Sequence, residues 1–224
     1  MLYTQFATGA DVAANNLFLL GPAQPLELTR SRSVEAGVKS LFWESRGEWN
    51  FAVFDIERNN VYAAAGGRAL NVAGQQKSRG AELALAVRPT PVWNLWANFA
   101  YTDAEYRNYN FTGGSFSGNT PPNVPRVVAN AGLAYRLPVA LPADVGASVR
   151  HVGERFHSDA NTVKLLAYTV IDAFAAVEVA KTRLTFRVRN LTNEKYAVWS
   201  DAFYPDQILL GAPRTYEVQA QFWF

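Results

Sequence analysis

The sequence predicts an all-β protein, an antiparallel meander of about ten strands that forms the wall of a membrane barrel. Three observations carry this prediction. Apolar and polar residues alternate with a period of two along most of the chain. Short and long connections alternate between these segments, and charged residues keep to one of the two strand faces. A run of about 18 apolar residues is absent, which excludes a transmembrane helix.

The alternation defines seven clear strands. Successive side chains of a strand point to opposite faces, so segment 93–102 places Leu95, Ala97 and Phe99 on one face and Trp96 and Asn98 on the other. The same pattern occurs at 77–89, 126–136, 143–150, 169–179, 182–189 and 215–224. Less regular strands are expected at 33–44, 48–58 and 2–6.

The connections sort by length. Short links at 45–47, 89–91, 138–142 and 181–182 alternate with long polar and aromatic ones at 8–32, 59–76, 104–125, 156–165 and 191–213. One end of the sheet should therefore carry turns and the other loops. Outer-membrane barrels have short periplasmic turns and longer extracellular loops, whereas Greek-key sandwiches do not sort their loops in this way.

The chemistry of the faces agrees with a barrel. A lipid-facing Arg or Lys near the midplane costs about 2–4 kcal/mol, so charges should be excluded from the apolar face. The alternating apolar residues of the clear strands include no charged residue, and the following charges all fall on the opposite set: Glu82, Arg136, Arg150, Asp172, Glu178, Arg187, Arg189 and Glu217. We expect one convex surface to carry Leu83, Leu85, Phe99, Leu133, Val177, Phe186, Val218 and Phe222.

Composition excludes several functions. The net charge of +2 without a Lys/Arg cluster argues against nucleic acid. The chain has no cysteine, which removes thiol catalysis and thiolate metal sites, and its two histidines form no metal-ligand pattern. The residues suggest no cofactor. The start, MLYTQFATGADVAANN, lacks the pattern of a secretory signal, so an exported chain would be a mature piece or a fragment.

Six motifs, in order, resemble one family. They are LELTRSRSVEAGVKS, SRGAELALAVRP, LWANFAYTDAEY, TPPNVPR, RVRNLTNEKYAV and the final GAPRTYEVQAQFWF. This succession resembles the C-terminal part of the barrel of TonB-dependent outer-membrane receptors of the siderophore-receptor type. The resemblance covers nearly the whole chain.

The resemblance implies a receptor of the bacterial outer membrane, not an enzyme, that actively takes up a ferric siderophore or a similar chelate. Its partners would be outer-membrane lipid, the TonB complex and the barrel-assembly machinery. The family's barrel has 22 strands and a plug domain. We therefore expect residues 1–224 to be a C-terminal barrel portion without plug, TonB box or signal peptide. In such a partial wall, strand Leu2–Phe6 and the last strand should not pair with each other.

The resemblance also suggests two sets of functional residues. Ligand contacts from extracellular loops would come from Tyr106, Arg107, Tyr109, Phe111, Phe116, Arg155, Trp199, Phe203 and Tyr204. Aromatic faces beside cations suit an aromatic chelate, although the same rings could pack the loops on one another. The barrel-assembly signal would be Tyr216, Val218, Phe222 and Phe224.

Two other hypotheses remain open from the residues. A complete ten-stranded barrel could carry hydrolytic residues at its outer rim, with His157 and Asp159 as the candidates. A soluble β-domain could instead bind a partner through its apolar face, because one dry face also occurs in soluble sheets.

Overall fold

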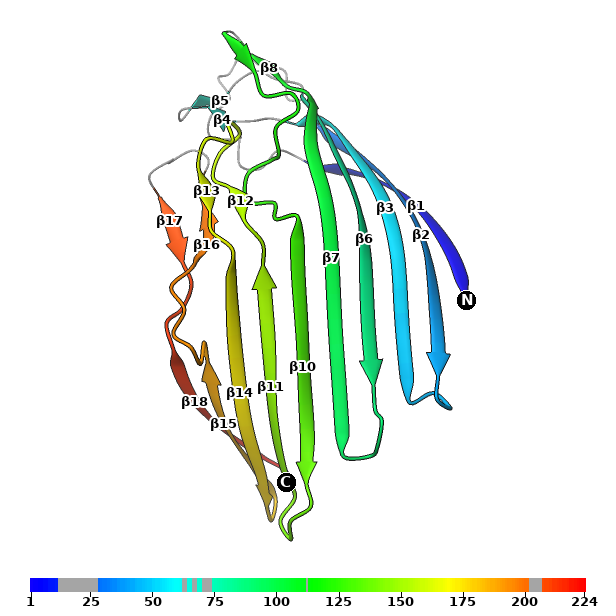
Figure 1. Cartoon of the computed structure of the whole chain (residues 1–224), viewed down its shortest axis with the longest axis vertical. Helices are drawn as coiled ribbons and strands as arrows, with labels where there is room; N and C mark the ends of the chain where they lie inside the picture. The colour runs from blue at the N-terminus through cyan, green and yellow to red at the C-terminus, as the bar shows by residue number, and fades with distance from the viewer. Residues whose placement is uncertain (12–27, 62–63, 66–67, 70–73, 112, 202–206) are drawn as a thin grey trace.

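The computed structural model describes residues 1–11, 28–61, 64–65, 68–69, 74–111, 113–201 and 207–224. Ten strands form one antiparallel sheet whose spatial order follows the chain, which confirms the predicted meander (Figure 1). Among the described residues no helix is long and apolar enough to span a membrane. The strands of the main sheet are β1 (Leu2–Asp11), β2 (Thr29–Phe42), β3 (Gly47–Val61), β6 (Gly74–Val87), β7 (Trp93–Asn108), β10 (Val127–Leu137), β11 (Ala143–Val152), β14 (Tyr168–Val179), β15 (Thr182–Arg189) and β18 (Thr215–Phe222).

The short and long connections lie at opposite ends of the sheet, as their lengths predicted. Short turns gather at one end of the wall and long loops at the other (Figure 1). The loops contain four short two-stranded pairs that the sequence did not predict, because two to four residues are too few for a period to be recognised. They are β4 (Ala64–Ala65) with β5 (Arg68–Ala69), β8 (Asn110–Phe111) with β9 (Gly114–Ser115), β12 (Arg155–Phe156) with β13 (Lys164–Leu165), and β16 (Ala197–Ser200) with β17 (Ile208–Leu210).

Several strands reach further into the loops than predicted. Asp11 still pairs with Thr29, and β3 and β6 remain paired up to Val61 and Gly74. The predicted loop limits at 8–32, 59–76 and 104–125 were therefore wrong at their strand ends. At 8–11, 29–32, 59–61 and 74–76 the apolar alternation that marks a strand fades before the strand ends, and at 103–106 it reverses, with the charged residues outward and Ala104 and Tyr106 inward.

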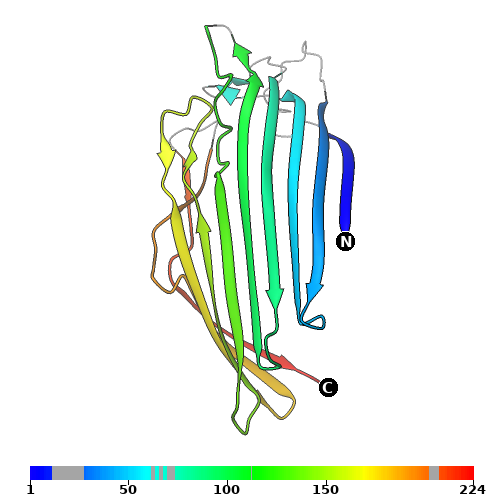
Figure 2. The same ribbon diagram turned by 45° about the vertical axis from the view of Figure 1, so that its right-hand side comes forward.

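The ten strands form a curved wall with two distinct faces (Figure 2). The register places Leu83 opposite Phe99, Leu133 opposite Ala147 and Phe186 opposite Val218, so the predicted apolar residues share one face. Glu82, Arg136, Asp172, Arg187 and Glu217 lie on the other. This confirms the predicted division of the two faces.

Burial distinguishes the two faces. The buried apolar residues of the main strands, Ala52, Ala104, Tyr106, Tyr168, Val170 and Ala176, all share the face of Glu82. Leu83, Phe99, Phe186 and Val218 are exposed. Side chains crowd together on the concave side of a curved sheet, as inside a barrel. We call the face of Glu82 inward and the face of Leu83 outward.

Cross-strand ion pairs connect the inward charges of the last strands. Arg189 Nε lies 2.6 Å from Glu217 Oε1. Glu178 pairs with Arg183 at 2.6 Å, because Arg183 lies directly opposite Glu178 in the register. Arg183 also contacts Asp144 at 2.8 Å.

The wall has two edges. β1 and β18 stand at opposite ends of the strand order, each with one neighbour in the main sheet. The described residues therefore form an open sheet, as expected of a partial barrel wall. The row of backbone N–H and C=O groups along each edge needs a further strand in lipid, where water cannot satisfy it.

Candidate functional site

Three long loops meet at the loop end of β7, β10, β11 and β14 in a set of buried and half-buried polar contacts, which we call the loop junction. Its members are Tyr106, Tyr109, Asn119, Asn123, Arg155, Asp159, Asn161 and Ser200. Each links residues that are distant in sequence, so the junction fixes the loop ends of β7, β11 and β15 relative to one another.

Asp159 lies at the centre of the loop junction. The hydroxyl of Tyr106 donates to Asp159 Oδ1 at 2.7 Å, and that of Tyr109 donates to Oδ2 at 3.3 Å. Both rings are buried and pack edge to face with centroids 4.8 Å apart, and Phe116 packs on Tyr109 in the same way. Burial raises the pKa of Asp159, while the two hydroxyl groups act in the opposite direction by stabilising the carboxylate.

Asparagines form the next contacts. Asn161 exchanges two hydrogen bonds of 2.8 Å with the backbone of Thr120. Asn123 accepts from the N–H of Ser200 at 3.0 Å and donates to its carbonyl at 2.8 Å. Both asparagines have positive φ, a conformation that Asn tolerates better than most residues. Turn conformation and loop bridging therefore come from the same residues.

Arg155 ties the last loop to the loop junction. Its Nη2 donates to the carbonyls of Ala197 and Val198, the latter at 3.0 Å, and its guanidinium lies 5.5 Å from the centroid of the Tyr168 ring. The side chain is 3% exposed, and Nη1 is buried without a hydrogen-bond partner among the described residues. Burial lowers the pKa of Arg155. The loop carbonyls thus surround a cation that water does not reach.

The NLTN segment has a structural role. Asn190 Nδ2 donates to the carbonyls of Glu194 at 2.9 Å and Ala212 at 3.0 Å, and its Oδ1 accepts from the N–H of Glu194 at 2.8 Å. Asn193 Oδ1 accepts from the N–H of Arg214 at 3.0 Å. The two asparagines therefore clamp the start of the last loop to its return, just before β18 begins.

The residues predicted to contact ligand separate into two groups. Tyr106, Tyr109 and Arg155 are buried in the loop junction, where their polar groups bond to protein, and Tyr106 lies in β7 rather than in a loop. Buried side chains can reach a ligand only if the loops rearrange. The structure supplies packing and bonding partners for these three side chains and for Phe116.

The other residues predicted to contact ligand are exposed, lie in strands or fall outside the described residues, and the residues of the predicted assembly signal lie in or after β18. Trp199 in β16 is 45% exposed. Arg107 lies in β7 and pairs with Glu105 at 2.5 Å. Phe111 lies in β8, and Phe203 and Tyr204 fall outside the described residues. Tyr216, Val218 and Phe222 point outward from β18, and Phe224 follows the end of that strand.

A cavity that the sequence did not indicate opens on the inward face below the last loop. Its volume is about 310 Å³, and Arg150, Asp172, Arg189 and Tyr196 line it. Ligand pockets begin at roughly 300 Å³. The strand positions of Arg150 and Arg189 could be predicted, but the fold of the last loop over them could not.

His157 and Asp159 do not form a hydrolytic pair. Both Asp159 carboxylate oxygens accept from tyrosines, so this carboxylate holds the loop junction together and does not orient an imidazole. The backbone carbonyl of His157 accepts from the Ser200 hydroxyl at 3.0 Å. These contacts assign the two residues to loop structure.

Comparisons with known proteins agree with the interpretation of this sheet as part of a membrane barrel wall. Residues 1–191 match the family described as TonB dependent receptor-like, beta-barrel. The ferrichrome outer membrane transporter/phage receptor of Escherichia coli K12 is 28% identical over 206 residues, which are 88% of this chain and 27% of that protein. The metal-pseudopaline receptor CntO of Pseudomonas aeruginosa PAO1 is 30% identical over 74% of this chain and 24% of its own length.

Solved structures show the same wall. The siderophore receptor PiuA of Acinetobacter baumannii superposes with a TM-score of 0.81 at 24% identity, over 98% of this chain and 33% of that one. The ferric yersiniabactin uptake receptor FyuA of Yersinia pestis gives 0.77 at 18% identity, over 99% and 34%. The chain thus spans about a quarter to a third of the length of the proteins it matches.

The family match over most of the chain, the open meander and the lipid-facing apolar surface lead to one conclusion. The chain belongs to the TonB-dependent receptor family, as a part of its outer-membrane β-barrel.

Proposed function

We propose that the chain forms part of a receptor that takes up a ferric siderophore or a similar metal chelate across the outer membrane. The observation that carries the proposal is the likeness, over most of the chain, to proteins named as ferrichrome, metal-pseudopaline and siderophore receptors. Energy would come from the TonB complex through other parts of the receptor. The last strand, with Tyr216, Val218, Phe222 and Phe224, would be read by the barrel-assembly machinery.

Ligand contact by this chain would begin at exposed residues near the loop end of the wall. Trp199 offers an aromatic face at the outer end of the wall, and Arg107 offers a cation. Below them the inward cavity carries Arg150 and Arg189. Cations beside aromatic rings favour an anionic chelate with aromatic groups. In this proposal Tyr106, Tyr109, Phe116 and Arg155 keep the loops in the shape that presents these groups.

Tryptophan fluorescence tests the proposal directly. The protein is titrated with a ferric catecholate, a ferric hydroxamate and ferric citrate, and quenching gives each dissociation constant. We expect one chelate class to bind, and W199A to weaken that binding about tenfold, the loss of roughly 1.4 kcal/mol. Trp93, on the outward face at the short-turn end, supplies the control W93A, which should bind normally.

Two results of this experiment would contradict the proposal. If none of the chelates quenches the fluorescence of the folded protein, the chain does not contribute a ligand site. If W199A and W93A bind with equal affinity, the ligand does not contact the last loop.

A further inference from the structure

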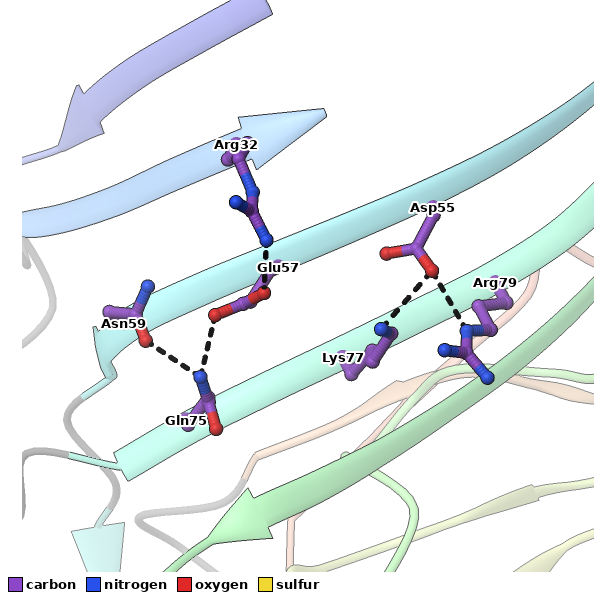
Figure 3. A network of polar contacts seen from close by, with 7 residues as sticks. All are labelled: Arg32, Asp55, Glu57, Asn59, Gln75, Lys77 and Arg79. Carbon is purple, nitrogen blue, oxygen red and sulfur yellow. Dashed lines mark hydrogen bonds and ion pairs between the residues drawn. The ribbon is translucent and has the colours of Figure 1, made fainter. Parts of the chain in front are cut away.

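Arg150 differs from the other inward arginines of the main sheet because it has no carboxylate partner among the described residues. The inward arginines that lie within 3.8 Å of a carboxylate oxygen are Arg58, Arg136, Arg183, Arg187 and Arg189. The outward face has similar pairs, such as Arg79 with Asp55 at 2.8 Å (Figure 3). The charge of Arg150 is therefore left without a counter-ion in the wall.

The surroundings of Arg150 hold its side chain without neutralising it. The residues directly opposite in the register are Asn130 on β10 and Val170 on β14, and both are neutral. The guanidinium carbon lies 6.0 Å from the centroid of the Tyr168 ring, within the range of a cation–π contact. Arg150 is exposed and lines the inward cavity below the last loop, so a ligand in that cavity can reach it.

The lining of this cavity is rich in hydrogen-bond donors. Ser148 and Tyr196 add hydroxyl groups, and Arg189 adds a second guanidinium. Among the described lining residues Asp172 is the one carboxylate, and its Oδ1 already accepts from the N–H of Asn190 at 2.8 Å. A group that only accepts hydrogen bonds fits such a lining best.

The charge balance of the neighbouring wall points to an anion as well. A second cavity of about 280 Å³ continues along the inward face, shares Asp172 and Arg189 with the first, and adds Arg187 to the lining. Glu217 pairs with Arg189 at 2.6 Å and lies 3.8 Å from Arg187. Three arginines thus face two carboxylates in this region, and the excess positive charge is that of Arg150.

The roof of the first cavity is fixed by contacts within the protein. Asn190, Tyr196 and Ala212 lie over it, and Asn190 Nδ2 donates to the carbonyl of Ala212 at 3.0 Å. The ring of Tyr196 lies on that of Tyr168 with centroids 4.3 Å apart. Because these groups are held in place before a ligand arrives, binding costs little reordering of the loop.

We propose that Arg150 binds a carboxylate group of the chelate, so that the receptor selects chelates with a free carboxylate, such as ferric citrate, over neutral hydroxamate chelates. A guanidinium suits this group because two of its N–H bonds can donate to the two carboxylate oxygens. The cavity of about 310 Å³ is at the small end of ligand pockets, so it takes one arm of a chelate. The selectivity rests on the proposed uptake function, whereas carboxylate binding can be tested without iron.

Arginine footprinting tests the carboxylate contact without a variant. The full chain is folded in detergent micelles and treated with phenylglyoxal, and mass spectrometry measures the modification rate of each arginine. Iron-free citrate should slow the modification of Arg150 about tenfold. Arg30 is the internal control and should react at the same rate with and without citrate, because it is exposed and without an ion pair but lies on the outward face. Sulfate at the same ionic strength should protect Arg150 much less.

Chelate binding tests the selectivity. R150Q should weaken the binding of ferric citrate about tenfold, measured by tryptophan fluorescence, and should not change the binding of a neutral ferric hydroxamate. R136Q removes another inward guanidinium at the short-turn end of the neighbouring strand β10, and it should bind ferric citrate as the parent does.

The results distinguish this proposal from the proposed uptake function. Unchanged modification of Arg150 in citrate, or equal protection by sulfate, would overturn the carboxylate site. Equal affinity of R150Q and the parent for ferric citrate would overturn the selectivity and leave chelate uptake standing. Protection of Arg150 by citrate without binding of any ferric chelate would support the carboxylate site and contradict the uptake function.

Discussion

At the scale of single residues, Asp159 is the most consequential side chain of the loop junction. Its carboxyl group is buried, and burial raises its pKa above the ordinary aspartate value. The folded protein therefore holds the proton more tightly than the unfolded chain does. The stabilising effect is complete below the unfolded pKa and is lost as pH rises through the raised folded pKa. The two tyrosine hydroxyl groups limit this loss.

We predict that the loop junction becomes less protected as pH increases. Amide hydrogen-exchange protection of residues 156–163 should fall in the parent protein as pH rises above about 4, the ordinary pKa of an aspartate. It should stay nearly level in D159N, whose side chain has the same shape and does not titrate. E194Q, a change to an exposed loop carboxyl group, is the control and should follow the parent. An equal slope in D159N would show that another group is responsible.

Asn190 stabilises the last loop in two separate ways. Its backbone adopts the left-handed conformation, and its side chain makes three hydrogen bonds. N190A should lose about 1–3 kcal/mol of unfolding free energy from the bonds and roughly 1 kcal/mol more from the positive φ. N190G should lose only the first part. Denaturant midpoints in detergent micelles measure both, with L191A at an exposed neighbouring site as the reference. Equal denaturation midpoints for N190A and N190G would show that the positive φ of residue 190 contributes nothing to the loss of stability in N190A.

At the scale of elements, the inward face pairs glycines with aromatic rings across neighbouring strands. The ring of Tyr3 covers Gly37, and that of Phe54 covers Gly80. Such pairs let a bulky ring lie flat on the wall where a larger residue would force it away. At Gly80 the backbone is close as well, because an added Cβ would lie 2.1 Å from the carbonyl oxygen of Tyr101.

We predict that the two glycines respond differently to alanine. The three atoms nearest to an added Cβ at Gly37 all belong to the Tyr3 side chain, which can rotate, whereas at Gly80 a backbone atom must move. G80A should therefore lower the unfolding free energy by about 1–3 kcal/mol, and G37A by clearly less. Denaturation followed by tryptophan fluorescence measures the difference. A larger effect of G37A would contradict the role of the Tyr101 carbonyl.

The sequence predicts some parts of these elements and not others. The middle of β7 was predictable because Leu95 and Phe99 alternate with Trp96 and Asn98. Its loop end was not, because after Tyr101 the outward positions become charged (Asp103, Glu105) while the inward positions carry Ala104 and Tyr106, which reverses the pattern of the strand's middle. The loop junction was even less predictable, since Asp159 meets Tyr106 across 53 positions of sequence. The positive φ of Asn123 and Asn161 could have been suspected from residue type, but their bonding partners could not.

At the scale of the whole molecule, the two faces of the wall explain its environment. The outward face is mainly apolar, and its charged residues are confined to the loop-side halves of β2, β3, β6 and β7, whereas the inward face carries charges along most of the wall. This division suits lipid on one side and a polar interior on the other. The open edges at β1 and β18 fit a wall that continues in neighbouring strands, as in the receptors that this chain resembles.

Thiol labelling along β7 tests this account most directly, because the chain contains no cysteine of its own. Single cysteines are placed at each position from Leu95 to Tyr101, and membranes carrying the protein are treated with a water-soluble maleimide. Labelling should alternate, with positions 96, 98 and 100 reacting and positions 95, 97, 99 and 101 protected by lipid. Uniform labelling along the strand, or reaction of the odd-numbered positions alone, would contradict the assignment of this chain to a membrane barrel wall.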